Sequence, residues 1–544
     1  MKLAARENEK NSCDQIGRDL SGSNAKPTID SKDLHLNSRE NLTENLSELM
    51  RGIETLSVTG PAEAEIRAIT YDSRKATPHS LFFAFQGAKV DGNRFVADAL
   101  SRGAVAIATE SPRPSDVPAS VAWIQLAPGS ERRALATASA NFFHHPASAL
   151  QLVGITGTNG KTTTSFLVDS ILRAAGQTTG LIGTTGYRMP DGERQARNTT
   201  PESLDLQEMF SIVRKASGTS VVLEASSHAL AMDRLWGCHF AAAVFTNLTH
   251  DHMNFHRTFD AYFAAKRRLF EGTGAGPADF SIVNVDDSWG ARLREELVQA
   301  GQRTLTYGLN PIAEITAPKF ELEFSGLNFI ADSPAGNIEV QSPLVGRVNV
   351  YNILAAIGAA IALRIPIAAI EKGIRSLENV PGRFELIDEG QPFHVAVDYA
   401  HADDAIRNLL RSARELNPLG RVLLLFGAGG ERDRTTRPLM GEAAGRNTQL
   451  VVLTSDNPRS EDPSQIIGDV VVGLQKANAN YRIEPDREKA LELILKEAQP
   501  GDLVLLAGKG HETYQILHDR TFEFDDRKMA RKALRALGYG RLKA

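Results

Sequence analysis

The sequence predicts an α/β protein of three domains: a small N-terminal α/β domain, a central domain on a mostly parallel sheet, and a C-terminal domain on a doubly wound sheet. Three observations support this fold class. At 544 residues the chain is too long to fold around one core. From about residue 148 onward, apolar strand-like runs alternate with helical runs, the pattern of parallel sheets. The apolar run 150–155 passes through a glycine-rich turn into a helix.

Composition and boundary signals divide the chain into four segments. Residues 1–44 are polar and charged and have too few apolar positions to offset the entropy cost of ordering, so we expect a disordered extension. We expect an N-terminal domain over residues 45–147 and a central domain over residues 148–379. The sequence Val-Pro-Gly-Arg-Phe at 380–384 marks the start of a C-terminal domain over residues 380–544.

The N-terminal domain shows two candidate ligand residues, Ser73 and Arg74. They lie at the end of a strand, where loops bind ligands, but an Asp-Ser-Arg sequence is more often only a turn. The expected elements of this domain are a short helix near 46–53, strands within 66–74 and 80–85, a helix at 95–102 and a strand at 104–109.

The central domain opens on a candidate phosphate-binding loop. The chain turns at Gly157-Thr-Asn-Gly160, and Lys161 begins an amphipathic helix. Backbone N–H groups of such a turn and helix start point at an anion. Lys161 can reach the outer phosphates, and the Thr162 hydroxyl can bind magnesium. A strict nucleotide-binding motif has glycine where this chain has Ile155. The alternative is a glycine-rich turn that Lys-Thr follows by chance, but the order of strand, turn and helix favours a nucleotide site.

Polar residues follow the next two strands of this domain. Glu224 ends the apolar strand 220–224, where an acid that orders magnesium would lie. The strand 242–245 leads into a loop with His250 and His252, for which a structural role is the commoner one. Their spacing does not fit a zinc protease, and Ser226-Ser227-His228 lacks the glycines of a serine-hydrolase elbow.

The rest of the central domain gives weaker signals. A helix at 259–270 contains Lys266, and nothing in its spacing distinguishes this residue from a solvated lysine. A strand ends at Asn284, residues 302–342 read as a β-rich segment, and 353–363 as a buried helix.

In the C-terminal domain four apolar strands end in polar loops. In a doubly wound sheet such loops share one edge, where these folds bind ligands. The loops carry acids, arginines and histidines that solvation alone explains poorly. Arg432 and Arg459 could bind carboxylates, and Asp456 and Glu512 an ammonium group, which suits a small zwitterion. The strands end at Asp398, Phe426, Thr454 and Leu506.

The composition excludes several classes of protein. A net charge of −5 gives no general reason to expect nucleic-acid binding, and no stretch approaches the roughly 20 apolar residues of a membrane span. The polar N-terminus lacks a signal core, so we expect a cytoplasmic protein. Two distant cysteines, Cys13 and Cys238, support neither a disulfide framework nor a zinc site, and Cys238 precedes an apolar strand as a packed thiol would. We expect a monomer without nucleic-acid partners or membrane insertion, although the sequence leaves the oligomeric state open.

Taken together and in order, five motifs resemble those of the Mur ligases, the ATP-dependent amino-acid ligases of peptidoglycan precursor synthesis. The resemblance covers about residues 46–540 and implies a central P-loop ATPase-like domain, a C-terminal Rossmann-like domain and an N-terminal domain for a UDP-linked substrate. The motifs are Thr156-Gly-Thr-Asn-Gly-Lys-Thr-Thr163, Glu224-Ala-Ser-Ser-His228, Thr246-Asn-Leu-Thr-His-Asp-His252, Tyr262-Phe-Ala-Ala-Lys266 and Asp398-Tyr-Ala-His401.

Within the family, Asp456-Asn-Pro-Arg459 resembles the signature of members that add meso-diaminopimelate. Diaminopimelate differs from lysine by a second carboxylate, which Arg459 could bind through two hydrogen bonds. The resemblance implies that diaminopimelate joins the D-glutamyl γ-carboxylate of UDP-MurNAc-L-Ala-D-Glu through an acyl phosphate. Two alternatives stay open: a sister ligase for another amino acid such as lysine, or for folate, and a non-catalytic nucleotide-binding module.

The resemblance also implies a role for each matching residue. The catalytic residues would be Lys161, Glu224, His252 and Lys266, and Thr162, Glu224, His252 and a CO2-derived carbamate on Lys266 would hold Mg2+. ATP would contact Gly157, Thr158, Asn159, Gly160, Lys161, Thr162 and Thr163, together with Asn352, Arg383 and Asp398. The UDP-substrate would contact Tyr71, Ser73, Ala88, Lys89, Val90, Asn198, Thr199, Thr200, Ser226 and Arg234, and diaminopimelate would contact Arg432, Asp456, Asn457, Pro458, Arg459, Gly508 and Glu512.

Overall fold

A computed structural model describes residues 42–85, 90–518 and 520–540. Most of the expected extension over residues 1–44 lies outside the described residues. The described chain already contains a strand, β1 (Glu44–Asn45), which pairs with β3 (Glu65–Ile66), so the expected boundary between residues 44 and 45 falls inside a strand.

The N-terminal sheet has the strand order β2-β7-β6-β5-β4. The pairs from β4 to β7 are parallel, and β2 joins β7 antiparallel at one edge. Buried Leu135 belongs to a core on one face, and buried Ala99 to a core on the other. The elements are α1 (Leu46–Leu49), β2 (Thr55–Thr59), β4 (Ala68–Thr70), the 3-10 turn η1 (Ser73–Lys75), β5 (Ser80–Phe83), η2 (Gly92–Phe95), α2 (Val96–Ser101), β6 (Ala104–Thr109), β7 (Ala122–Leu126), α3 (Glu131–Phe142) and η3 (Pro146–Ala149).

The central sheet runs β11-β10-β9-β12-β8-β13-β14-β15 and is parallel from β9 to β15, with an antiparallel edge formed by β10 and β11. The mostly parallel sheet expected from the sequence is therefore confirmed. Its elements are β8 (Gln151–Thr156), α4 (Lys161–Ala174), β9 (Thr179–Gly183), β10 (Gly186–Met189), β11 (Gly192–Arg194), α5 (Ser203–Lys215), β12 (Ser220–Glu224), α6 (Ser227–Ala231), β13 (Ala242–Phe245), α7 (Met253–His256), α8 (Phe259–Glu271), β14 (Ser281–Asn284), α9 (Ser288–Gln299) and β15 (Thr304–Tyr307).

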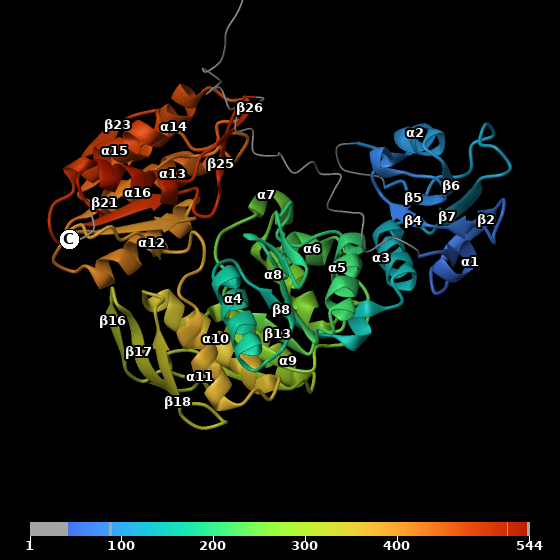
Figure 1. The fold of residues 1–544 in the computed structure, drawn as a ribbon, viewed down its shortest axis with the longest axis horizontal. Coiled ribbons are helices and arrows are strands. Elements are labelled where there is room, and N and C mark those ends of the chain that lie inside the picture. Colours follow the sequence, from blue (N-terminus) through green and yellow to red (C-terminus); the bar gives the residue numbers. More distant parts are fainter. Residues whose placement is uncertain (1–41, 86–89, 519, 541–544) are drawn as a thin grey trace, which may run out of the picture. The chain divides into compact units, whose positions relative to one another are not determined.

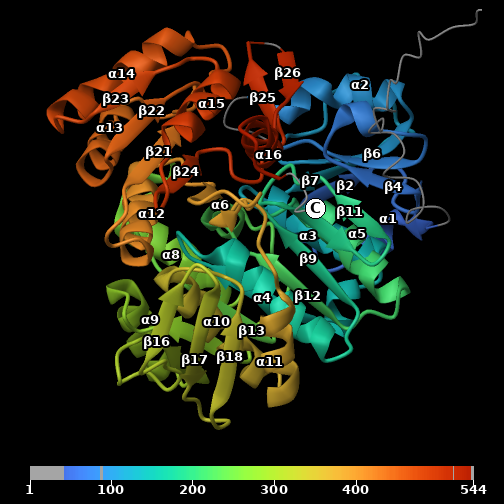
Figure 2. The same cartoon turned by 60° about the vertical axis from the view of Figure 1, so that its left-hand side comes forward.

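Alternation along β8 fills a core on each face of this sheet. Val153 and Ile155 pack with residues of α4, α10 (Arg347–Ala362) and α11 (Ile367–Ser376), whereas Leu152 packs with residues of α5, α8 and α9. Figures 1 and 2 show α4, α10 and α11 grouped beside the strands. The expected β-rich segment after residue 302 contains, besides β15, an antiparallel sheet of β16 (Phe320–Glu323), β17 (Gly326–Ala331) and β18 (Ile338–Ser342).

The C-terminal sheet has the order β19-β20-β24-β21-β22-β23 and is parallel except for the edge strand β19. Helices cover both of its faces, because Leu424 packs in one core and Leu425 in the other. The elements are β19 (Glu385–Leu386), β20 (His394–Asp398), α12 (Asp403–Leu416), β21 (Val422–Phe426), α13 (Thr436–Asn447), β22 (Leu450–Leu453), α14 (Pro463–Lys476), β23 (Tyr481–Ile483), α15 (Arg487–Glu497), β24 (Leu503–Ala507), the hairpin of β25 (Tyr514–Leu517) and β26 (Arg520–Glu523), and α16 (Asp526–Ala536).

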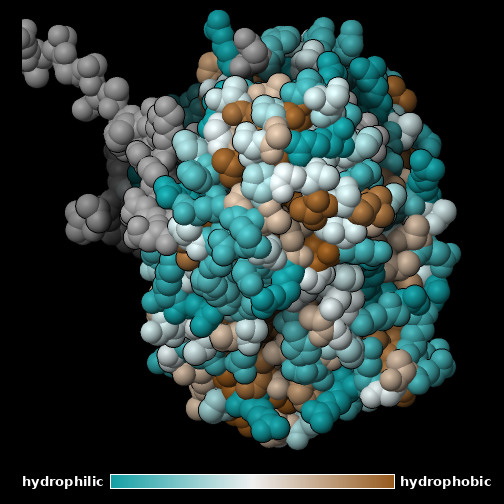
Figure 3. Space-filling model, turned by 90° about the vertical axis from the view of Figure 1, so that its right-hand side faces the viewer, coloured by the Kyte–Doolittle hydropathy of each residue, from teal (hydrophilic) through white to brown (hydrophobic). Residues whose placement is uncertain are grey.

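The surface is mixed in character. On the face seen in Figure 3, small groups of hydrophobic residues lie among hydrophilic ones. None of the helices in the described part of the chain is both long enough and apolar enough to span a membrane. Cys238 is buried, as expected, and burial raises the pKa of its thiol to about 12.

Candidate active site

The turn between β8 and α4 requires a glycine at its start. Gly157 has a φ of +150°, and a Cβ atom there would lie 1.8 Å from Thr246 Oγ1. Ile155, which stands where a strict motif has glycine, is buried inside β8. Position 157 of this loop therefore excludes a side chain, whereas position 155 does not require glycine.

The loop after β13 holds the phosphate loop in place. Thr246 Oγ1 donates a hydrogen bond to Asn159 O over 2.6 Å. The amide of Asn247 accepts from Asn159 N at 2.9 Å and donates to Asn159 O at 3.1 Å. Thr158 N donates to Asn247 O at 2.8 Å. These bonds fix the backbone of the loop before any ligand binds. Thr246 and Asn247 belong to the third of the five sequence motifs, which implies no role for either residue.

Two lysines meet at one carbonyl oxygen. Lys161 Nζ donates to Gly157 O over 3.0 Å and to Thr158 O over 2.9 Å, and Lys266 Nζ donates to Gly157 O over 2.7 Å. Burial lowers the pKa of Lys161. Burial, and then the charge of Lys161, lowers the pKa of Lys266 well below its ordinary value, which favours the neutral amine.

The expectation that Lys266 is a solvated helix lysine is wrong, because the residue is 1% exposed. Its Nζ also lies 4.4 Å from the ring centre of Tyr262, one turn earlier on α8. The sequence held a signal for this position: Lys266 follows Tyr262 by four residues and precedes Phe270 by four, so it lies on the apolar face of the helix.

Glu224 is a buried carboxylate with a defined orientation. It is 1% exposed, and its two oxygens accept from Thr184 N at 2.9 Å and from Thr184 Oγ1 at 3.0 Å. A Cβ at Gly183 would lie 2.3 Å from Glu224 Oε1, so the glycine makes room for the acid. The negative charge of Glu224 raises the pKa of Lys161 and so acts against the lowering by burial.

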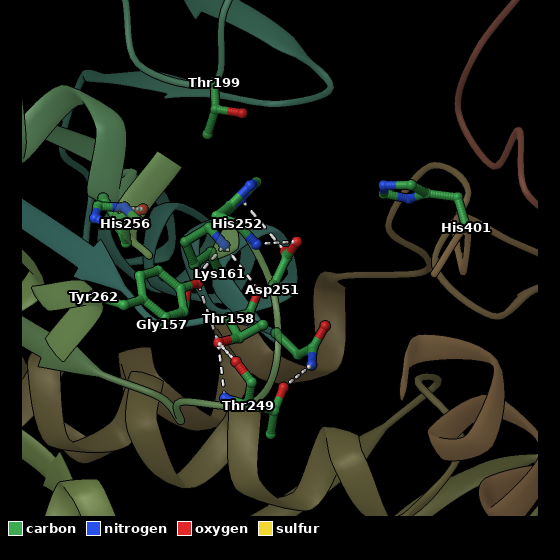
Figure 4. Close-up of polar contacts among 12 residues, drawn as sticks. Gly157, Thr158, Lys161, Thr199, Thr249, Asp251, His252, His256, Tyr262 and His401 are labelled. Atoms are coloured by element: carbon green, nitrogen blue, oxygen red, sulfur yellow. Dashed lines mark hydrogen bonds and ion pairs between the residues drawn. The ribbon is translucent and has the colours of Figure 1, made fainter. Parts of the chain in front are cut away.

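The loop before α7 brings a carboxylate and an imidazole to the same place. Asp251 Oδ1 accepts from His252 N at 2.8 Å, and Asp251 Oδ2 lies 3.4 Å from His252 Nε2. Figure 4 shows both residues beside Lys161, with the ring of His401, from the loop after β20, directed toward them. Behind them, the buried His256 Nε2 lies 2.9 Å from Ser227 Oγ.

The donor set beside Lys161 fits a magnesium ion that is also bound by phosphate oxygens. Thr162 and Glu224 supply a hydroxyl and a carboxylate that are 3% and 1% exposed. Magnesium prefers oxygen ligands and, at phosphate sites, often takes only one or two of them from the protein. Among the residues that the structure describes, no three or more His, Cys, Asp or Glu side chains are grouped to bind a metal by themselves.

Of three further residues expected at the nucleotide, Arg383 joins the C-terminal segment to the phosphate loop, Asp398 supports the backbone of its own segment, and Asn352 lies against the loop from α10. Arg383 Nη2 donates to Thr162 Oγ1 over 3.1 Å, and its guanidinium lies 4.9 Å from the ring centre of Tyr399. Asp398 accepts from Phe384 N and Ala400 N, both at 2.8 Å, and burial raises its pKa. Asn352 on α10 packs so closely that a Cβ at Gly160 would lie 2.5 Å from its Oδ1.

Residues expected around the muramoyl-peptide lie next to Glu224. Thr200 Oγ1 donates to Glu224 O at 2.6 Å and accepts from Ser226 N at 3.0 Å. Arg234 Nη1 donates to Thr200 O at 2.8 Å, and Arg234 also pairs with Glu202 at 2.8 Å. The structure thus brings Thr200, Ser226 and Arg234 into one network with the candidate magnesium ligand.

The remaining residues expected at the UDP-substrate are more dispersed. Tyr187, which the sequence analysis did not select, donates from its hydroxyl to Asn198 O at 2.7 Å. Thr199 Oγ1 lies 3.0 Å from Thr184 Oγ1. In the N-terminal domain, Tyr71 donates to Asp205 Oδ2 at 2.6 Å, Ser73 is buried at the start of η1, and Val90 is exposed; Ala88 and Lys89 lie outside the described residues.

The polar loops of the C-terminal sheet do share one edge, namely the end of the sheet at which its parallel strands have their carboxyl ends. Strands β20, β24, β21 and β22 are parallel neighbours, so their carboxyl ends lie side by side. Asn457 Nδ2 donates to Glu512 Oε2 at 2.8 Å. Asp456 is 7% exposed, and its Oδ2 has no hydrogen-bond partner among the described residues. This edge therefore offers an acceptor that is buried and unused.

Cationic side chains complete the edge. Arg459 has a φ of +54°, its backbone N donates to Ile516 O at 3.2 Å, and its Nη1 donates to Gly430 O. A Cβ at Gly429 would lie 3.5 Å from both Arg432 Cγ and Arg459 Nη1, so the two arginines flank that glycine. A Cβ at Gly430 would lie 1.9 Å from Pro458 O, so the loop after β21 and the loop after β22 are in close contact.

Arg487 is a structural residue of this edge that the sequence analysis missed. It is fully buried with Asp526, and the two side chains form hydrogen bonds of 2.8 and 2.6 Å. Its guanidinium also donates to Ala507 O at 2.9 Å and to Ser455 O at 3.4 Å, the residues before Gly508 and Asp456. No local pattern pairs Arg487 with a residue 39 positions away, so only the fold reveals it.

Comparison with known proteins agrees with this arrangement. Residues 65–142 match the family model described as Mur ligase family, catalytic domain, residues 155–360 match the Mur ligase middle domain, and residues 382–510 match the Mur ligase, glutamate ligase domain.

Relatives match over most of the chain. A protein of Solibacter usitatus (strain Ellin6076) named UDP-N-acetylmuramoyl-L-alanyl-D-glutamate--2,6-diaminopimelate ligase is 50% identical over 497 residues, which is 91% of this chain and 99% of that one. A solved structure with the same name is 31% identical and covers 91% of this chain and 100% of its own, with a TM-score of 0.64. The structure of the MurF ligase from Thermotoga maritima in complex with ADP shares the fold at 18% identity, with a TM-score of 0.55, over 81% of this chain and 93% of that one. The chain belongs to the Mur ligase family.

Proposed function

We propose that this protein is an ATP-dependent ligase that joins meso-diaminopimelate to the D-glutamyl γ-carboxylate of UDP-MurNAc-L-Ala-D-Glu. Relatives up to 50% identical over nearly their whole length carry the name of that ligase. The observation that carries the proposal is the loop after β22 at the edge of the C-terminal sheet, which holds both the unused carboxylate oxygen of Asp456 and the guanidinium of Arg459. An ammonium group and a carboxylate on one small molecule would satisfy both.

The reaction divides into two steps. In the first, the γ-carboxylate of the UDP-linked substrate attacks the γ-phosphorus of ATP, which gives an acyl phosphate and ADP. Lys161 would turn from the carbonyls of the loop to the transferred phosphoryl group, whose charge it offsets. In the second step, the amine of diaminopimelate attacks the acyl carbon and expels phosphate. That amine must arrive neutral, so a base or solvent must take its proton.

Magnesium and a carbamate on Lys266 are part of the proposal. Thr162, Glu224 and His252 would hold magnesium, which offsets phosphate charge when it is bound. Only a neutral amine adds to CO2, and the lowered pKa of buried Lys266 supports that form. The carbamate would supply an anionic oxygen ligand in place of a cation, beside the carbonyl of Gly157.

The substrate contacts expected from the motifs extend the proposal to the other domains. Thr200, Ser226 and Arg234 would bind the muramoyl-peptide, since they adjoin Glu224, and Tyr71 and Ser73 would contact the UDP-sugar. Asn352, Arg383 and Asp398 would contact the nucleotide. Because ATP is a cytoplasmic co-substrate, its use also supports a cytoplasmic site of action.

Phosphate release tests the proposal. Purified protein with ATP, magnesium and UDP-MurNAc-dipeptide should release phosphate on addition of meso-diaminopimelate, and much more slowly with L-lysine. A Lys161→Met variant serves as the background control, because it removes the phosphate-binding ammonium group. A preference for lysine or for another amino acid would identify a sister ligase instead. The absence of ADP formation with every amino acid would favour a non-catalytic nucleotide-binding protein.

A further inference from the structure

The edge of the C-terminal sheet contains a buried cation to which neither the motifs nor the proposed reaction gives a role. Lys509 lies between Gly508 and Gly510 in the loop after β24, and it is fully buried. Its Nζ lies 3.3 Å from Glu512 Oε2 and 3.4 Å from Asn457 Oδ1. Both partners are residues expected to contact diaminopimelate.

We propose that Lys509 determines specificity for the incoming amino acid by neutralising Glu512, so that Asp456 remains the uncompensated carboxylate at this edge. This inference rests on the proposed function and deepens it, because it assigns different electrostatic roles to two acids on adjacent loops.

The contacts of Glu512 support its half of the division. Glu512 Oε2 accepts a hydrogen bond from Asn457 Nδ2 at 2.8 Å and forms an ion pair with Lys509 at 3.3 Å. Asn457 is itself held, because its Oδ1 accepts from Ile516 N at 2.9 Å on the neighbouring hairpin. The oxygen of Glu512 is therefore occupied by a cation and by an amide that cannot easily move away.

Asp456 is in the opposite situation. Its backbone O accepts from Gln515 Nε2 at 2.7 Å, which fixes the chain, while its Oδ2 is buried without a hydrogen-bond partner among the described residues. Gly508 has a φ of +109°, and a Cβ there would lie 2.7 Å from this oxygen. Glycine at 508 therefore leaves the approach to Asp456 Oδ2 open. A buried carboxylate oxygen without a partner is costly unless a ligand supplies one.

The charge at this edge follows from these assignments. Among Lys509 and the residues expected to contact diaminopimelate, Arg432, Arg459 and Lys509 are basic and Asp456 and Glu512 are acidic, so this set has one basic side chain in excess; Arg487 does not add to it, because it is paired with Asp526. Diaminopimelate has two carboxylates and two ammonium groups at neutral pH, whereas lysine has one carboxylate fewer. A site with excess positive charge favours diaminopimelate, and the removal of the Lys509 charge shifts the preference toward lysine. With an effective dielectric constant of about 20, one unit charge roughly 10 Å away changes an affinity by roughly tenfold.

The decisive experiment measures the ratio of kcat/KM for meso-diaminopimelate to kcat/KM for L-lysine. Lys509→Met keeps the length and the apolar stem of the side chain and removes the charge, and Lys509→Arg keeps the charge. Lys509→Met/Glu512→Gln removes the cation and the anion together. Arg421→Met is the matched control, because Arg421 pairs with Asp502 through bonds of 3.0 and 2.6 Å at the opposite, amino end of the same sheet.

We expect the ratio to fall about tenfold in Lys509→Met, to stay within about threefold of wild type in Lys509→Arg and Arg421→Met, and to recover in the double variant. A purely structural lysine would slow both amino acids equally, so an unchanged ratio in Lys509→Met overturns the inference. If Lys509→Met does not fold, Glu512→Gln alone gives the opposite sign: the ratio should rise, and a fall overturns the inference. A wild-type enzyme that does not use diaminopimelate contradicts the proposed function itself, which separates the two failures.

Discussion

Gly157→Ala should weaken ATP binding by at least about 30-fold, through two effects that the structure quantifies. A φ of +150° is open to glycine and costs other residues about 1–3 kcal/mol. The new Cβ would lie 1.8 Å from Thr246 Oγ1, far inside any normal contact, and overpacking of this kind costs about 1–3 kcal/mol. The sum, about 2–6 kcal/mol, acts on the loop that must hold the phosphates.

A second substitution separates the two effects. Thr246→Ala removes the clashing oxygen, so Gly157→Ala/Thr246→Ala should bind ATP more tightly than Gly157→Ala alone. Recovery should be incomplete, because the strained φ remains and the hydrogen bond from Thr246 to Asn159 O is lost. Titration calorimetry with a non-hydrolysable ATP analogue and magnesium measures each affinity, and thermal unfolding shows whether the fold survives.

Two results would refute the reasoning. The first is an affinity of Gly157→Ala within about threefold of wild type, which would mean that the loop accommodates a side chain at 157. The second is a double variant that binds no better than the single one, which would mean that Thr246 Oγ1 is not the obstacle.

Three other predictions follow from the site. Lys266→Ala should nearly abolish turnover while UDP-substrate binding stays measurable, and short carboxylic acids should restore part of the activity if a carbamate is the active form; wild-type activity in the variant would contradict its role. Arg459→Ala should lower kcat/KM for diaminopimelate by about 10- to 150-fold and leave KM for ATP unchanged, because it removes one charge-assisted pair of about 1.5–3 kcal/mol. An equal loss of kcat/KM for lysine would show that Arg459 does not bind the second carboxylate. Asp526→Ala should lower the free energy of unfolding by about 3–5 kcal/mol, measured with denaturant, because it leaves the fully buried guanidinium of Arg487 without its carboxylate. A loss below about 1 kcal/mol would show that the fold does not need this pair.

The sequence was most informative where an apolar run was long and continuous. The strands at 220–224 and 242–245 have the bounds expected from their short apolar runs, because each is buried on both faces of a parallel sheet. The helix expected at 353–363 begins earlier, at Arg347, directly after Gly346. Polar and apolar residues alternate over its first turns, so the continuous apolar run marks only its later part. The antiparallel edge of β10 and β11 was not predicted, because its strands are short and only partly apolar.

At the site, the sequence could identify residues but not their partners. The motifs select Lys161, Lys266, Asn457 and Glu512, yet the convergence of both lysines on Gly157 O and the bond from Asn457 to Glu512 depend on contacts between distant segments. The roles of Arg487 and Thr246 were not predicted for the same reason. Each side chain donates hydrogen bonds to the backbone of a loop distant in the sequence, and the sequence does not show which loop that is.

The arrangement of the hydrophobic cores bears on how the two proposed sites could vary. The phosphate loop is supported by cores on the two faces of the central sheet, whereas the edge proposed to bind the amino acid is supported by cores of the C-terminal sheet, and Leu322 packs against a core of each sheet. With the proposed assignment, substitutions in the loops after β22 and β24 should change the amino-acid preference and leave most of the packing beneath the nucleotide site in place. The proposed steps of carboxylate activation and amine attack thus depend on largely different hydrophobic cores.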